Sequence, residues 1–498
     1  MKKRTKILAT IGPASDSQEI LEALIKAGVN VFRMNFSHGD HTYHEVVLQK
    51  IRRAMQTTGL IVGVLQDISG PKIRVGQLSE DFDLKPEDVL VFKKETIVGE
   101  KLSDSRYQLS INQSDILPML KVGEYIYLYD GMIRTKVIEV NDEGILAEVQ
   151  NRGTLSSNKG VNFPNTRIGI DVLTPKDRED ILWGIKHDVD FMAISFVQHA
   201  QDIINVRDIL ETNGGHQQLY AKIEKFDAVE NIDEIVAVSD GLMVARGDLG
   251  IEVPYYEVPT IQKMLIRKAN QASIPVITAT QMLLSMTQKE MATRAEISDV
   301  ANAVLDGTDV VMLSEESAVG HNPVLVVETM VNTIRETEKI YPFYKLTHFE
   351  HHDEMDIIDE SAVVMGKNLE VDGILAMTSS GQSAKKIARY RPTFPIYAVM
   401  HEERIARMLT MVWGVVPAFL VKKNKLELML AEVIQNGLKR DVLSKKSRYI
   451  LTAGDPVGVA GTTNNIRILH EHEMAYFEAL SLPKSKKKNI STESATLF

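Results

Sequence analysis

The sequence contains no cysteine among its 498 residues. Disulfide bonds and thiolate metal sites are therefore excluded, and a reducing compartment suits the chain. Apolar runs are short, and none approaches the roughly 20 residues that a helix needs to cross a membrane. The first residues are basic and lead directly into a predicted strand, without the apolar core of a signal peptide. We therefore expect a cytoplasmic protein with no membrane partner.

The sequence also lacks an excess of positive charge. It has 57 Lys and Arg against 67 Asp and Glu, a formal net charge of −10. No basic stripe offsets this balance, which argues against a nucleic-acid partner. A hydrophobic fraction of 44% and a charged fraction of 25% are typical of soluble globular proteins. The length is sufficient for about three domains.

Short apolar strands alternate with helical segments in two parts of the chain. The alternation predicts strands at residues 6–11, 29–36, 60–68, 189–194, 218–223, 241–244, 275–279 and 309–313. Eight strand–helix units are the number that closes a (β/α)₈ barrel.

Capping signals mark some of the helix boundaries. Ser15 and Asp16 are predicted N-caps of the first helix, which Gly28 ends. Thr174 followed by Pro175 predicts the helix with which the alternation resumes.

Two further regions differ from this pattern. Residues 72–170 contain short β-rich runs joined by turn signals such as Asp130-Gly131, which predicts an all-β insertion. After a linker at 341–352, strands predicted at 373–377, 396–399, 418–421 and 449–452 alternate with helices, as in a small open α/β domain. We therefore expect a barrel formed by residues 1–71 and 171–345, the insertion at 72–170, an α/β domain at 355–482 and a flexible tail at 483–498.

Polar side chains follow seven successive strands of the predicted barrel, at the carboxyl ends where chemistry in this fold occurs. They are Arg33, Asn35, Ser37, Asp67, Ser195, Lys222, Glu224, Asp248, Thr280 and Ser314. Core packing does not explain so regular a pattern.

Two of these residues, Glu224 and Asp248, are candidate ligands of one hard cation. Lys222 lies two residues before Glu224, on the same side of an extended chain, and would place an ammonium beside that metal. A metal and a lysine together neutralise charge on a phosphoryl group in transfer. The alternative is that these are structural polar residues at strand ends.

Three histidines, His38, His41 and His44, are spaced three residues apart and suggest a zinc site. They lack a convincing set of further ligands. A solvated helix start is therefore the preferred interpretation.

Several motifs resemble the pyruvate kinase family, and the similarity extends over nearly the whole chain apart from the tail. The motifs are FRMNFSHG (residues 32–39), DISGPKIR (67–74), MVARGDLG (243–250), TATQML (278–283) and TRAE (293–296). The resemblance implies a TIM barrel with an inserted all-β lid and a C-terminal allosteric α/β domain. It also implies a homotetramer that transfers phosphate from phosphoenolpyruvate to ADP, giving pyruvate and ATP in the last step of glycolysis.

By this resemblance, Glu224 and Asp248 would bind Mg²⁺, with Mn²⁺ as an alternative ion. Lys222 would steady the phosphoryl group and the developing enolate, and Arg33 would hold the substrate phosphate. The backbone amides of Gly247 and Asp248 would bind the substrate carboxylate, as helix N-termini bind anions.

Further roles follow from the same resemblance. Thr280 would bind substrate and, with Ser314, help to relay the proton that converts enolpyruvate to pyruvate. Asp130 would move over the site when the lid closes. The implied nucleotide contacts are Asn35, His38, Arg74 and Lys159.

Many pyruvate kinases need K⁺, and the matching ligand positions Asn35, Ser37 and Asp67 are present. The K⁺-dependent members usually carry glutamate where this chain has Lys72. Because an ammonium is a compact cation, we expect Lys72 to supply the charge of K⁺, so that K⁺ is not required. The alternative is a solvated lysine at the hinge of the lid.

A loop in the C-terminal domain joins a predicted strand to a helix and is rich in hydroxyl groups. It comprises Thr378, Ser379, Ser380, Gly381, Gln382 and Ser383. A helix cap would explain it, but hydroxyls and amides at a helix start also suit a phosphate. The resemblance favours a site for a phosphorylated metabolite effector.

The sequence alone leaves two other functions open. One is a Mg²⁺-dependent barrel lyase acting on pyruvate or an oxoacid, which would not need a lid or nucleotide contacts. The other is a non-catalytic effector sensor, which would not need Lys222, Glu224 and Asp248. The chain also departs from the family pattern at Leu284, Ala292, Glu315 and Ser317. These departures bear on details of the proton relay and of the subunit contacts, and not on the reaction.

Overall fold

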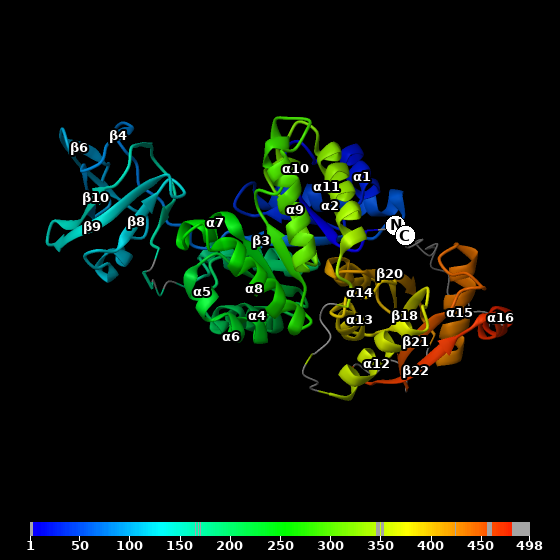
Figure 1. Cartoon of the computed structure of the whole chain (residues 1–498). Coiled ribbons are helices and arrows are strands. Elements are labelled where there is room, and N and C mark those ends of the chain that lie inside the picture. Colours follow the sequence, from blue (N-terminus) through cyan, green and yellow to red (C-terminus); the bar gives the residue numbers. More distant parts are fainter. Residues whose placement is uncertain are drawn as a thin grey trace.

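The computed structural model describes residues 3–480, except 165, 168, 170, 345–348, 350–352, 424 and 456–460. The tail predicted at 483–498 and much of the linker predicted at 341–352 lie outside the described residues. In Figure 1 a β-rich unit lies at one end, a barrel in the middle and a smaller α/β unit at the other end. Among the described residues, no helix is both long and apolar enough to cross a membrane.

Eight parallel strands close the barrel in the order β1-β17-β16-β15-β14-β13-β3-β2. Their bounds are β1 Lys6–Thr10, β2 Val31–Asn35, β3 Gly63–Ile68, β13 Phe191–Ile194, β14 Gln218–Ile223, β15 Gly241–Ala245, β16 Val276–Ala279 and β17 Val310–Leu313. The strands are buried along almost their whole length, as expected for a parallel sheet covered by helices. The predicted (β/α)₈ barrel is confirmed.

Helices surround this barrel (Figure 1). They are α1 Gln18–Ala27, α2 His41–Thr58, α3 Pro175–Lys186, α4 Ala200–Thr212, α5 Phe226–Glu230, α6 Ile232–Val238, α7 Arg246–Glu252, α8 Val258–Gln271, α9 Arg294–Asp306, α10 Glu315–Ala318 and α11 Pro323–Thr337, with 3₁₀ helices at Leu284–Thr287 and Glu338–Ile340.

The predicted caps are partly correct. Thr174 caps α3 with Pro175 in its first turn, as expected. The N-cap of α1 is Ser17, so the prediction of Ser15 or Asp16 is wrong. The hydroxyl of Ser15 instead accepts a hydrogen bond from the Gly12 amide at 3.2 Å, and Asp16 accepts one from the Tyr43 hydroxyl at 3.2 Å.

The insertion between β3 and α3 is all-β, as predicted, apart from the 3₁₀ helix Ser114–Met119, and we call it the lid. A seven-stranded sheet has the order β12-β8-β9-β10-β5-β7-β6, and β11 pairs with β4. The bounds are β4 Phe82–Leu84, β5 Val89–Lys93, β6 Glu100–Ser103, β7 Arg106–Ser110, β8 Tyr125–Leu128, β9 Ile133–Asn141, β10 Gly144–Val149, β11 Gly153–Leu155 and β12 Val161–Asn162.

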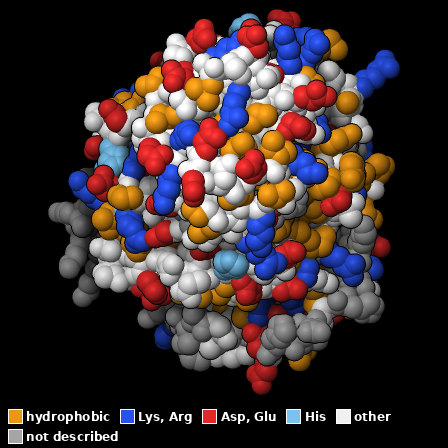
Figure 2. All heavy atoms as spheres, turned by 90° about the vertical axis from the view of Figure 1, so that its left-hand side faces the viewer, with side chains coloured by type: hydrophobic (Ala, Val, Ile, Leu, Met, Phe, Trp, Pro, Cys, Tyr) orange, Lys and Arg blue, Asp and Glu red, His pale blue; other side chains and the backbone are white. Residues whose placement is uncertain are grey.

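The lid has a separate hydrophobic core, which includes Phe92, Ile126 and Ile133. Figure 2 views the molecule from the side on which the lid lies in Figure 1. Acidic and basic side chains are interspersed over this face, without a broad field of one sign.

The C-terminal unit is a five-stranded sheet with the order β20-β19-β18-β21-β22. Its elements are α12 Glu354–Asn368, β18 Gly373–Met377, α13 Gln382–Ala388, β19 Ile396–Met400, α14 Glu403–Met408, a 3₁₀ helix Leu409–Met411, β20 Val415–Leu420, α15 Leu426–Lys439, β21 Tyr449–Gly454, β22 Thr463–Leu469 and α16 Glu471–Ala479. The edge strand β22 runs antiparallel to β21 and was not predicted, because most of its residues are polar or solvent-facing.

The C-terminal unit packs against the amino ends of the barrel strands. Arg391 pairs with Asp309, just before β17, at 3.1 Å, and Arg407 pairs with Asp190, just before β13, at 2.7 Å. This packing leaves the carboxyl ends of the strands, where the candidate residues lie, on the opposite side of the barrel.

A buried carboxylate joins α12 to α13. Asp359 is 0% exposed and accepts a hydrogen bond from the Ser383 hydroxyl at 2.7 Å. Burial raises the pKa of Asp359 to about 8, against the opposing effect of that hydrogen bond. Because the unfolded chain releases this proton near pH 4, the folded state loses stability as the pH rises from about 4 to 8.

We therefore expect Asp359→Asn to raise the melting temperature of the C-terminal unit at pH 9 by ~5 °C or more. The difference from wild type should shrink toward pH 5, because Asp359 is then protonated in the folded state. Differential scanning calorimetry between pH 5 and pH 9 measures it. The exposed Glu354→Gln on the same helix is the control, and a difference that does not change with pH would contradict the assignment.

Candidate active site

Lys222 lies at the centre of a buried polar cluster at the carboxyl ends of β3, β13 and β14. Its Nζ lies 2.9 Å from Oε1 of Glu224 and 3.2 Å from Oδ1 of Asp67. It also donates a hydrogen bond to Oγ of Ser195 at 2.7 Å, and Ser195 donates to the carbonyl of Ile68 at 2.6 Å. Lys222 and Glu224 therefore lie on one side of the chain, as their spacing predicts.

Asp67 holds a second cation beside Lys222. Nε of Arg33 donates to Oδ2 of Asp67 at 2.6 Å, and Nη1 donates to Oγ1 of Thr10 at 2.9 Å. Burial alone would raise the pKa of Asp67, but the charges of Lys222 and Arg33 outweigh it and lower the pKa below its usual value. Asp67 is therefore ionised and fixes two positive side chains next to each other.

The lysine remains charged although its side chain is only 12% exposed. Burial alone would lower the pKa of Lys222, but Asp67 and Glu224 outweigh it and raise the pKa. The site therefore keeps a permanent ammonium in a largely water-free environment, where its electrostatic effect is strong.

Glu224 lies in the same buried environment. It is 2% exposed, and its Oε2 accepts a hydrogen bond from the Phe196 amide at 2.8 Å. Burial raises its pKa to about 7, the charge of Asp248 adds to this rise, and Lys222 opposes it. The two carboxylates are thus close enough to repel each other, which is the electrostatic condition in which a shared cation binds well.

The first turn of α7 carries Gly247 and Asp248 directly after β15. The Gly247 amide donates to Oγ1 of Thr280 at 2.9 Å. Thr280 has a φ of 68°, in the left-handed region that is rare for a β-branched residue. Such strain persists only where the surrounding structure maintains it.

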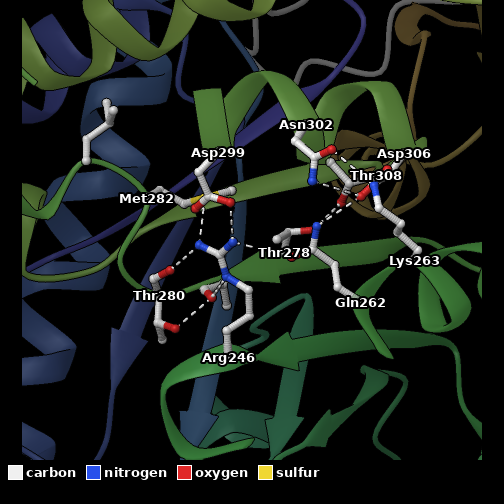
Figure 3. A network of polar contacts seen from close by, with 12 residues as sticks. Arg246, Gln262, Lys263, Thr278, Thr280, Met282, Asp299, Asn302, Asp306 and Thr308 are labelled. Carbon is white, nitrogen blue, oxygen red and sulfur yellow. Dashed lines mark hydrogen bonds and ion pairs between the residues drawn. The ribbon is translucent and has the colours of Figure 1, made fainter. Parts of the chain in front are cut away.

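Arg246 supplies that support (Figure 3). Nη2 donates to the carbonyl of Thr280 at 2.6 Å, Nε donates to the carbonyl of Ala279 at 3.2 Å, and Nη1 donates to Asp299 at 2.8 Å. The sequence predicted no role for this arginine. The only available signal was its position inside the MVARGDLG motif, because Asp299 lies 53 residues further along the chain.

Ser314 directly follows β17, and its hydroxyl is buried and has no hydrogen-bond partner among the described residues. Its amide donates to Glu316 at 2.7 Å, and the other oxygen of Glu316 accepts from the Leu283 amide at 3.1 Å. The two loops after β16 and β17 are thereby joined, and the Ser314 hydroxyl stays available.

The histidines do not form a metal site. Nε2 of His41 lies 2.7 Å from Asp180, while His44 stacks on Phe36 with ring centroids 3.9 Å apart. Nε2 of His44 lies 2.9 Å from the carbonyl of His38. Throughout the part of the chain that the structure describes, no group of three or more His, Asp or Glu side chains is arranged to hold a metal ion.

Glu224 and Asp248 fit a different kind of metal site. Their oxygen atoms are the hard ligands that Mg²⁺ takes from one or two carboxylates. The ion then completes its coordination with water and substrate oxygens, so a third protein carboxylate is not needed.

The residues predicted to contact the nucleotide lie partly on the lid and partly on the barrel. Nη1 of Arg74 donates to the carbonyl of Asn158 at 3.0 Å, and Nζ of Lys159 lies 4.1 Å from the ring centroid of Tyr129. On the barrel side, Asn35 accepts from the Ser37 amide at 3.2 Å, and Ser37 and His38 are exposed. These lid and barrel residues make separate contacts in this structure.

Lys72 lies at the base of the lid. Its Nζ lies 3.5 Å from Asp130, which forms a lid turn with Gly131. Both side chains are substantially exposed, at 40% and 55%. Among the predicted K⁺ ligands, Asp67 uses both of its oxygens for Arg33 and Lys222.

A pocket lies in the C-terminal unit, in a different part of the molecule from the barrel residues described above. Its lining includes Thr378, Ser379, Ser380, Gln382 and Ser383. Gly381, with a φ of 89°, turns the chain into α13 and donates its amide to Oγ1 of Thr378 at 2.8 Å. The hydroxyl-rich loop therefore borders a cavity.

Comparison with known proteins agrees with this geometry. The family model of the pyruvate kinase barrel domain matches residues 2–327, and that of the pyruvate kinase alpha/beta domain matches residues 356–469. A pyruvate kinase of Sporosarcina psychrophila is 43% identical over 480 residues, which cover 94% of this chain and 80% of that protein. A pyruvate kinase of Clostridium acetobutylicum is 38% identical over 472 residues, which cover 94% of this chain and 99% of that protein.

Among solved structures, a pyruvate kinase from Cryptosporidium parvum superposes with a TM-score of 0.88 at 33% identity. The match covers 94% of this chain and 96% of that chain. With the barrel, the paired cations and carboxylates at its mouth, and two family models that together extend over most of its length, the chain belongs to the pyruvate kinase family.

Proposed function

We propose that Lys222, Arg33, Glu224 and Asp248 form the centre at which this pyruvate kinase transfers a phosphoryl group from phosphoenolpyruvate to ADP in the cytoplasm. The observation that carries the proposal is the buried ammonium of Lys222, held between Asp67 and Glu224 beside the guanidinium of Arg33. Fixed positive charge in a dry site is what phosphoryl transfer needs. A lyase or a non-catalytic sensor would not require this arrangement.

Each group has a proposed part in the reaction. Arg33 binds the phosphate and orients it, and Lys222 neutralises charge that develops on the phosphoryl and enolate oxygens. The amides of Gly247 and Asp248 bind the substrate carboxylate, for which the Gly247 amide exchanges its bond to Thr280. The hydroxyls of Thr280 and Ser314 then lie on the route of the proton that enolpyruvate takes up.

The pyruvate kinase family is generally metal-dependent. We propose Mg²⁺ as the metal, with Mn²⁺ as an alternative, held by Glu224 and Asp248. When bound, it neutralises negative charge on the phosphoryl oxygens.

The metal assignment is tested by titrating Mg²⁺ into the chelator-treated enzyme. We expect no activity without the metal. We expect Glu224→Gln to raise the half-saturating Mg²⁺ concentration by tenfold or more, because loss of even an outer-shell partner of a metal ligand typically costs on the order of tenfold or more in affinity. The exposed Glu211→Gln is the matched control. Equal metal dependence in Glu224→Gln and wild type would contradict the assignment.

The nucleotide is the second proposed substrate of the site. We propose that Asn35, His38, Arg74 and Lys159 contact ADP or ATP.

We also propose a homotetramer, supported by the strongly exposed side chains of Tyr255 (77%), Tyr256 (69%) and Met291 (80%) near α7, α8 and α9.

We propose that the pocket bordered by residues 378–383 binds a phosphorylated metabolite that regulates activity. Ser380→Glu should then abolish the kinetic response to this effector, because the added carboxylate repels a phosphate. Basal activity should remain unchanged, since the pocket lies in a different unit from the active site.

This prediction is checked by measuring rates with and without a panel of phosphorylated metabolites. Ser361→Glu adds the same charge to an exposed position on α12 and should respond like wild type. An unaltered response in Ser380→Glu would refute the site, as would a wild-type enzyme that no phosphorylated metabolite affects.

A further inference from the structure

Helix α7 is short and connects two functional regions. It has seven residues, with Gly247 and Asp248 in the first turn and Glu252 at its end. At about 1.5 Å per residue it spans ~10 Å, so a shift at one end is transmitted to the other. Whatever holds Glu252 therefore also influences the turn proposed to bind the substrate carboxylate.

The lid contacts the last turn of α7 at two points. Nδ2 of Asn162, in β12, donates a hydrogen bond to Oε1 of Glu252 at 3.2 Å. The turn between β8 and β9 lies on Ile251, since a Cβ placed on Gly131 would be 3.4 Å from Cγ2 of Ile251. The two contacts come from different segments of the lid and reach adjacent residues of one helix.

The lid turn has a defined shape at this contact. Tyr129, Asp130 and Gly131 have φ values of 53°, 52° and 82°, three successive residues in the left-handed region. A turn so constrained presents one fixed surface to Ile251.

Glu252 is a buried carboxylate with few polar partners. It is 4% exposed, and its Oε2 has no hydrogen-bond partner among the described residues. The nearest cation is Lys225, with Nζ 3.7 Å from Oε2, and Lys225 directly follows the candidate metal ligand Glu224. A buried carboxylate with so few partners is costly, so its single bond to Asn162 matters more than an exposed one would.

We propose that the Asn162–Glu252 contact is a positioning contact that couples the lid to the substrate-binding turn of α7. The lid carries proposed nucleotide contacts and α7 carries the proposed carboxylate site, so the contact makes the binding of ADP and phosphoenolpyruvate mutually favourable. This inference depends on the proposed function for the identity of the two ligands. Asn162 and Glu252 themselves act through the lid and the helix, without touching substrate.

The kinetic test varies both substrates together. In wild type, saturating ADP should lower the KM for phosphoenolpyruvate, and in Asn162→Ala this effect should fall by about tenfold, the size expected for one hydrogen bond to a carboxylate. The change should lie in KM under saturating ADP more than in kcat. Gln150→Ala, at an exposed lid position whose side chain bonds Glu148, should behave like wild type.

A double-mutant cycle separates coupling from general loss of structure. Glu252→Ala should reproduce the effect of Asn162→Ala, and the double variant should be no worse than either. Glu252→Gln keeps the acceptor oxygen and should restore most of the coupling. Additive effects, or a wild-type coupling that Asn162→Ala leaves intact, would overturn the proposal.

Hydrogen exchange provides a measurement that does not depend on activity. Amides of residues 246–252 should exchange faster in Asn162→Ala than in wild type or Gln150→Ala, with the rest of the barrel unchanged. Unaltered exchange in α7 would refute the contact's positioning role. If α7 responds as expected but phosphoenolpyruvate and ADP do not react, the proposed function fails while the coupling between the lid and α7 stands.

Discussion

Lys222→Met is expected to lower kcat by about 10²- to 10³-fold, the loss seen when a preorganised stabilising group is removed from an active site. The ammonium is buried between Asp67 and Glu224, where its charge acts on the phosphoryl group with little screening. Its contribution is largest in the transition state, so the loss appears in kcat more than in KM.

The fold should persist in this variant. Methionine fills a similar volume, and Asp67 keeps its ion pair with Arg33. Glu224 keeps its hydrogen bond from the Phe196 amide, so metal binding should stay nearly intact.

The measurement is kcat and both KM values, together with Mn²⁺ affinity by electron paramagnetic resonance. Lys6→Met is the matched control. Lys6 is also buried, but its ammonium contacts the carbonyl of Val415 at the other end of the barrel. A kcat of Lys222→Met within a few-fold of wild type would show that the assignment is wrong.

The second large effect concerns monovalent cations. We expect the wild-type enzyme to be active with Mg²⁺ in buffer free of K⁺, because Lys72 supplies a positive charge at the base of the lid. In Lys72→Glu, activity without K⁺ should fall by an order of magnitude or more and return when K⁺ is added. The reason is that the new carboxylate adds negative charge beside the phosphates of the bound substrates. Asp130, which lies 3.5 Å from Lys72, would also lose its partner.

Rates measured across a K⁺ series, with tetramethylammonium keeping the ionic strength constant, test this expectation. Lys121→Glu makes the same charge change at an exposed lid position and should create no K⁺ requirement. A wild-type enzyme that is nearly inactive until K⁺ is added would contradict the proposed role of Lys72.

The barrel could be predicted because its signals are local. The strand β14 was predicted with its observed bounds, since a buried parallel strand is a continuous apolar run. The i, i+2 spacing likewise predicted that Lys222 and Glu224 point to the same side of the chain. In the structure, Nζ of Lys222 lies 2.9 Å from Oε1 of Glu224.

The features that were missed depend on distant residues or on weak patterns. Arg246 supports the strained Thr280 through Asp299, and no spacing rule connects the arginine with that carboxylate. The edge strand β22 has few buried residues, so it shows little of the hydrophobic pattern by which strands are recognised. The ion pairs of Asp67 join residues of β2, β3 and β14, and β13 separates β14 from β3, so no local pattern connects these side chains.

A coupled assay of pyruvate formation by the purified protein, with ATP measured in parallel, tests directly whether the protein transfers the phosphoryl group to ADP. Phosphoenolpyruvate, ADP and Mg²⁺ together should yield pyruvate and ATP in equal amounts, and omission of any one of them should stop both. Pyruvate formed from an oxoacid, but not from phosphoenolpyruvate and ADP, would indicate a lyase. The absence of pyruvate in a protein that still binds phosphorylated metabolites would indicate a sensor, and either result would rule out phosphoryl transfer from phosphoenolpyruvate to ADP.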